Sequence, residues 1–118
     1  MSIRLRWDDN DNNVLHQIFE EGWTLQAYYH SIEALEVMLN GRQHPVQLIM
    51  NLDGAKTPPM RFARGRTVDE AKATANVERI ILVNPGYFMP VVNCPVAIVS
   101  TMDEAHAVLD GAQEKIPA

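Results

Sequence analysis

Short apolar strands and amphipathic helices alternate along this chain, and their order constrains the fold more than any other feature. Two strands are predicted first. A helix, a buried strand, a helical stretch, two more strands and a final helix follow them. Such alternation is typical of α/β domains with a parallel sheet. We therefore predict one small α/β domain over residues 1–118, with a mixed, mostly parallel sheet of four or five strands, an N-terminal β-hairpin and three or four helices.

The predicted hairpin consists of two strands joined by a polar turn. Ile3, Leu5 and Trp7 alternate with two arginines, which is the pattern of a half-buried strand. The run of Asp and Asn at residues 8–13 favours a turn, and residues 14–20 then predict the second, antiparallel strand. A calcium loop is the alternative interpretation of this run, but its sixth position lacks Gly and its twelfth lacks Glu.

Helical spacing and cap residues predict the remaining elements. Thr24 is the predicted N-cap of a first helix, whose apolar residues recur every three or four positions and which ends at Gly41. Residues 60–75 predict a helix broken near Gly65, with a capping box at residues 67–70; one kinked helix is the alternative. The other predicted elements are strands at residues 45–52, 79–83 and 95–100, and a helix from residue 102 to about residue 113 that Thr101 caps.

Composition argues against several classes of function. Hydrophobic residues make up 47% of the chain and charged residues 21%, which is typical of a globular domain. A net charge of −5 disfavours nucleic-acid binding, because phosphate contacts need clustered Lys and Arg. The single cysteine cannot form an intramolecular disulfide, which suits a reducing cytoplasm. No signal peptide and no apolar run of roughly 20 residues are present, so we expect a cytoplasmic protein without membrane association.

Four segments, placed in order along the chain, carry a resemblance to a known family. They are Ile18–Thr24 before the first helix, Gln47–Asp53 as the central strand, Val77–Val83 as the next strand, and Ala97–Ala105 at the last strand-to-helix turn. In these segments the chain resembles the STAS-like fold of anti-sigma-factor antagonists and sulfate-transporter tails, and most closely its small stand-alone bacterial relatives without assigned function. The resemblance implies a non-enzymatic protein-interaction or regulatory module, for which we expect self-association as a dimer or a protein partner.

Two departures from that family bear on function. Its regulatory members carry an Asp-Ser-Ser type sequence at the start of the helix after the central strand, and a serine there is phosphorylated. The corresponding place here reads Ala55–Pro59, in which Thr57 alone can take that role, so a phospho-switch at Thr57 is an alternative hypothesis. The family also has a helix between its last two strands, for which residues 87–92 are too short and too closely bounded by proline.

The carboxyl end of the predicted sheet is a candidate binding site, because ligands of open α/β sheets favour that edge. Asp53 ends a strand there, and Thr57 precedes a proline-started helix whose N-terminus offers free N–H groups. Arg61 and Arg64 share a helix face and are suited to hold a phosphate or a carboxylate. A small-anion, small-ligand or enzymatic site from Asp53 to Arg64, with Cys94 as a further lining residue, is therefore the second hypothesis.

Each of these residues also has a structural interpretation. Asp53 before Gly54 is a common turn dipeptide, and Thr57 is a plausible helix cap. The arginines, with Arg66, fit a solvated helix face, and Cys94 fits a packed thiol. The sequence leaves both interpretations open.

Apolar residues outside the helical stripes predict an interaction surface. Phe62, Tyr87, Phe88 and Met89 are its candidate members, since aromatic residues and Met are enriched at interfaces. No catalytic residue, cofactor or metal is predicted. The four histidines are scattered, whereas zinc needs three or four converging ligands, and no glycine-rich phosphate loop occurs.

Overall fold

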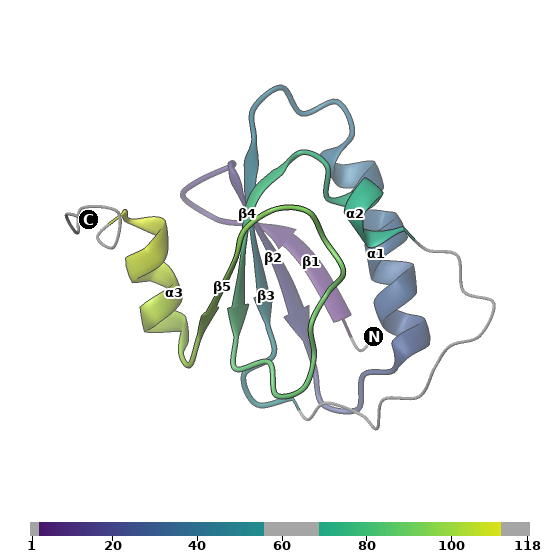
Figure 1. Ribbon diagram of the computed structural model, residues 1–118, viewed down its shortest axis with the longest axis vertical. Helices are drawn as coiled ribbons and strands as arrows, with labels where there is room; N and C mark the ends of the chain where they lie inside the picture. The colour runs from purple at the N-terminus through teal and green to yellow at the C-terminus, as the bar shows by residue number, and fades with distance from the viewer. Residues whose placement is uncertain (1–2, 56–68, 112–118) are drawn as a thin grey trace.

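The fold is a five-stranded mixed sheet with helices on both of its faces. The computed structural model describes residues 3–55 and 69–111. Its elements in chain order are β1 (Ile3–Trp7), β2 (Val14–Phe19), α1 (Leu25–Leu39), β3 (Val46–Asn51), α2 (Glu70–Ala73), β4 (Val77–Val83), β5 (Val96–Val99) and α3 (Met102–Leu109) (Figure 1). The predicted α/β class and the N-terminal hairpin are confirmed.

The strands lie in the sheet in their chain order, from β1 to β5. β1 is antiparallel to β2, with Leu5 opposite Gln17, and the remaining neighbours are parallel. Parallel neighbours need a crossover connection, which α1 provides between β2 and β3. Because β3 occupies one side of β2, the hairpin partner β1 takes the other side and forms an edge of the sheet.

Two apolar clusters hold the layers together. Figure 1 shows α1 and α2 on one side of the sheet and α3 on the other. The larger cluster lies under α1, where Tyr28, Ile32, Leu35 and Leu39 pack at the predicted helical spacing. The smaller one joins α3 to the opposite face, and its buried members are Val14, Ile49, Ile81, Val83, Ala105 and Val108. Burial of each large aliphatic side chain contributes about 1.5–3 kcal/mol, so the larger cluster dominates the stability.

An irregular segment joins β4 to β5 in place of a helix and closes the larger cluster. Phe88 is buried there, with its ring centroid 5.0 Å from that of Tyr28 and 5.8 Å from that of Trp23. The assignment of Phe88 to an interaction surface is therefore wrong, because its ring fills the space that a crossover helix would cover. Its neighbours Tyr87 and Met89 are exposed, at 90% and 52%.

Two helix ends differ from the prediction. α3 ends at Leu109 instead of near residue 113, since Gly111 takes a left-handed φ of 78° that no helix continues through. α2 begins at Glu70 with Asp69 as its N-cap, because the Asp69 side chain accepts a hydrogen bond from the Lys72 N–H. The predicted break near Gly65 lies outside the described residues.

Candidate functional site

The outer edge of β1 carries the backbone groups of every second residue. The Asp8 N–H donates to the Val14 carbonyl, with 2.9 Å between the atoms, which sets the phase of the antiparallel ladder. Alternation along that ladder turns the backbone groups of Arg4 and Arg6 toward β2. The N–H and C=O groups of Ile3, Leu5 and Trp7 therefore point away from the sheet. Among the described residues, those of Ile3 and Leu5 have no partner, and the Trp7 carbonyl accepts a hydrogen bond from the Arg6 guanidinium at 3.4 Å.

A second hydrogen bond fixes the same phase from the other side of β2. The Gln47 N–H on β3 donates to the Asn13 carbonyl at 2.8 Å. The backbone N–H and C=O groups of the odd-numbered residues of β2 therefore point toward β3, and those of the even-numbered residues point toward β1. His16 and Ile18 are thus the residues that bond β1. Both observations give the same outward set on β1.

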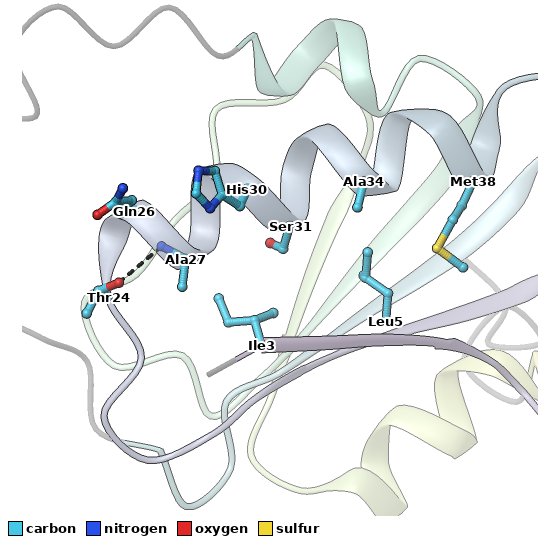
Figure 2. Close-up of a pocket in the computed structure, with 9 residues that line it drawn as sticks. All are labelled: Ile3, Leu5, Thr24, Gln26, Ala27, His30, Ser31, Ala34 and Met38. Carbon is cyan, nitrogen blue, oxygen red and sulfur yellow. Dashed lines mark hydrogen bonds between the residues drawn. The ribbon is translucent and has the colours of Figure 1, made fainter. Parts of the chain in front are cut away.

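The side chains of the outward residues line an apolar groove between β1 and α1. Figure 2 shows Ile3 and Leu5 pointing up toward the helix. Opposite them, α1 presents Ala27, Ser31 and Ala34, which recur at spacings of four and three and so share one helical face. The groove has a volume of about 500 Å³, and Thr24, Gln26, His30 and Met38 complete its lining.

The groove exists because α1 lies over β1 but presents small side chains to it. The buried face of α1 packs on the central strands through Ile32, Leu35 and Leu39. Over the middle of the groove the helix has short side chains, of which Ala34 is exposed and Ala27 half-buried, and the longer Met38 lies at one end. The predicted N-cap is confirmed at the entrance, where the Thr24 hydroxyl accepts a hydrogen bond from the Ala27 N–H at 3.0 Å.

A buried polar chain runs beneath the groove. The Gln17 carboxamide nitrogen donates to the Ser31 hydroxyl at 2.8 Å, and that hydroxyl donates to the Tyr28 carbonyl at 2.6 Å. Gln17 is fully buried, and its side-chain oxygen has no partner among the described residues. Sequence reasoning did not single out Gln17, although its place between Leu15 and Phe19 on the α1 face was a usable signal.

The opposite face of β1 carries two arginines, each beside an acidic side chain. Arg4 and Arg6 are exposed and point away from α1, because side chains alternate along a strand. The Arg4 Nε lies 2.9 Å from a Glu20 carboxylate oxygen, and an Arg6 nitrogen lies 3.5 Å from one of Asp9. Exposed pairs of this kind contribute about 0–1 kcal/mol and leave most guanidinium donors open to a further partner.

The turn after β1 contains one partly buried hydrogen bond between a histidine and a carboxyl group. His16 Nε2 lies 2.8 Å from Asp8 Oδ1, and the His16 side chain is almost fully buried. The hydrogen bond from His16 holds the pKa of the Asp8 carboxyl below its ordinary value, and the Asn10 N–H adds to this effect. The polar run that predicted a turn is thereby tied to the sheet.

The residues predicted at the carboxyl end of the sheet have separate outcomes. Asp53 is exposed in a turn where its N–H donates to the Asn51 side chain at 2.9 Å, which fits its structural interpretation. Thr57, Arg61, Phe62 and Arg64 lie outside the described residues, and so does Arg66. The anion site and the phospho-switch therefore stay predictions.

Cys94 packs against the larger apolar cluster and is half-buried. Burial raises the pKa of its thiol. A reactive cysteine needs the opposite shift, since the thiolate is the nucleophile. The packed-thiol interpretation fits these surroundings.

Comparisons with protein families, with curated proteins and with solved structures found no match to this chain. Among the described residues, no helix is long and apolar enough to cross a membrane. The same residues contain no group of three or more His, Cys, Asp or Glu side chains placed to hold a metal ion.

Proposed function

We propose that the protein is a non-enzymatic interaction module of the STAS-like kind that its sequence resembles, and that it binds an extended segment of a protein partner along β1. One observation carries this proposal: Ile3 and Leu5, whose backbone groups point outward from β1, also line the groove with their side chains. An added strand needs both features at one edge. Its backbone pairs with the edge strand, and its alternate side chains need a place to pack.

The groove suits short apolar side chains. A volume of about 500 Å³ lies within the range of ligand pockets, roughly 300–1,000 Å³. The backbone hydrogen bonds of an added strand supply affinity regardless of sequence, and the groove selects the side chains that enter it. Ser31 and His30 place polar groups on the helix side, within a lining that is otherwise mostly apolar.

The rival enzymatic hypothesis has less support. Asp53 forms a turn, and the raised pKa of the Cys94 thiol opposes nucleophilic catalysis. We place the protein in the cytoplasm, which the single half-buried cysteine fits. Dimer formation stays a prediction, and size-exclusion chromatography with light scattering tests it, since a strict monomer at high concentration would contradict it.

Peptide titration tests the strand-binding proposal. Three labelled heptapeptides, in which valine alternates with glutamate, with glutamine or with lysine, are titrated with the protein and followed by fluorescence anisotropy. At least one should bind, and Ala34→Leu should weaken that binding because the larger side chain fills the groove. Leucine keeps the helical propensity close to that of alanine, so the fold is retained.

Lys72→Leu on α2 is the matched control, since Lys72 is exposed and lies outside the groove. It should bind the peptides as the wild type does. Failure of all three peptides to bind, or equal binding by the wild type and the Ala34→Leu variant, would contradict the proposal.

A further inference from the structure

We infer that the segment bound by β1 carries acidic side chains on the residues that point away from α1, and that it belongs to a different protein from this chain. The inference rests on the proposed strand binding and identifies the chemical class of the partner. Its basis is the alternation along β1. Apolar side chains face the groove, whereas Arg4 and Arg6 face the other side.

An added strand places every second side chain next to those arginines. Directly opposed residues in an antiparallel pair have Cβ atoms about 4.5–5.5 Å apart, which is within reach of a guanidinium and a carboxylate. Arg4 has Glu20 as an acidic neighbour and Arg6 has Asp9 and Asp8, and the two arginine side chains are 57% and 48% exposed. Each guanidinium has five N–H donors, so a further carboxylate can be accommodated.

Register excludes a second copy of this chain as the favoured antiparallel partner. When Leu5 faces Leu5 of a second copy, Arg4 faces Arg6 on both sides of the twofold axis. When Ile3 faces Leu5, Arg4 faces Arg4, and when Leu5 faces Trp7, Arg6 faces Arg6. These are the registers that pair three or more residues of β1 through its outward groups.

Like charges that face each other directly destabilise a strand pair. The arginines therefore oppose self-pairing at this edge, in the way that charged side chains protect other edge strands. The same two side chains favour a strand of opposite charge. Arg4 and Arg6 thus disfavour a second copy of this chain and favour an acidic strand of another protein.

The net charge of the protein opposes the binding preference that we infer. A chain with a net charge of −5 repels an acidic peptide over long range and attracts a basic one. A preference for the acidic peptide must then come from local cations at the binding edge. Among the described residues, Arg4 and Arg6 are the cations on β1.

The test compares the three heptapeptides with each other at low salt. The glutamate peptide should bind about tenfold more tightly than the isosteric glutamine peptide, which corresponds to two exposed charge pairs of ordinary strength. The lysine peptide should bind more weakly than either. Added salt should reduce the difference, because it screens exposed charges.

The charge-reversal variant Arg4→Glu/Arg6→Glu should invert the order, so that the lysine peptide binds best. Lys72→Glu makes a charge change of the same kind on α2, away from β1, and should preserve the wild-type order. Equal binding of the three peptides would overturn this inference and leave the proposed strand binding intact. Absence of binding by all three would instead overturn the strand binding. A β1-paired dimer seen by light scattering and abolished by Leu5→Pro would overturn the choice of a foreign partner.

Discussion

Single residues set the geometry of the groove through contacts that differ in how visible they are in the sequence. Thr24 was predictable as a cap because its hydroxyl acts on the backbone three residues ahead. Gln17 was not, since its partner Ser31 is 14 residues away and only the packed structure brings the two together. The same holds for His16 and Asp8, which meet because the turn returns β2 beside β1.

The Asp8–His16 contact predicts a pH dependence of stability. The pKa of Asp8 is lowered in the folded state from its ordinary value of 3.8, so the folded protein binds fewer protons than the unfolded chain around and below that pH. The contact therefore stabilises the fold above the ordinary pKa, and this contribution is lost as the pH falls through the lowered value. Asp8→Asn should reduce stability at pH 5–6 and make the decline below pH 4 shallower, as measured by urea unfolding at each pH.

A background variant checks the cause of this effect. In His16→Gln, the further change Asp8→Asn should alter the acid decline much less than it does in the wild type. An unchanged effect of Asp8→Asn in that background would assign the lowered pKa to other groups.

Helices and strands can be predicted from the sequence where the spacing of apolar residues is regular over the whole element. The alternation of Ile3, Leu5 and Trp7 predicted a half-buried strand, and its exposure pattern in β1 agrees. The segment between β4 and β5 was predicted to lack a helix, but its burial was not, because proline-bounded apolar residues carry no period from which to choose a face. Phe88 entered the core and Tyr87 did not for a reason that only the tertiary structure contains.

The groove itself was outside the reach of sequence reasoning. Its apolar wall on α1 includes Ala27 and Ala34, and two alanines on a helix do not reveal whether they are packed or left open. The arginines of β1 were visible as the polar face of a strand. Their proposed role in binding depends on the position of β1 at the edge of the sheet.

Proline substitutions test the assignment of outward and inward backbone groups in β1. Leu5→Pro removes an N–H that points to solvent, whereas Arg6→Pro removes one that bonds β2. Relative to the alanine variant at the same position, Arg6→Pro should lose at least about 1 kcal/mol more stability than Leu5→Pro. Chemical denaturation of the four variants measures this difference, and equal losses would contradict the assigned phase.

The whole molecule combines one extensively covered face with an edge strand, β1, that no other strand of the described residues pairs on its outer side. α1 and the aromatic residues around Phe88 bury the central strands, while the edge strand retains unpaired groups among the described residues. Stability and binding therefore depend on different parts of the structure. Substitutions in the groove or on β1 can therefore remove binding and preserve stability.

Phe88 and Tyr87 are neighbours in the chain, but Phe88 is buried in the core and Tyr87 is exposed at the surface. Phe88→Ala should lower the free energy of unfolding by about 3–5 kcal/mol, because it removes a buried ring from the aromatic cluster. Tyr87→Ala should change the free energy of unfolding by less than about 0.5 kcal/mol, since its side chain is 90% exposed. Thermal and urea unfolding measure both, and similar losses in the two variants would contradict the placement of the β4–β5 segment.

Amide hydrogen exchange, resolved by residue with NMR, tests strand addition most directly. In the free protein the amides of Arg4 and Arg6 should be protected and that of Leu5 should exchange quickly. Saturation with the glutamate–valine heptapeptide should protect the Leu5 and Trp7 amides and leave those of Arg4 and Arg6 as they were. If the peptide binds while the Leu5 amide continues to exchange at its free rate, the partner does not pair with β1 and the proposed function is wrong.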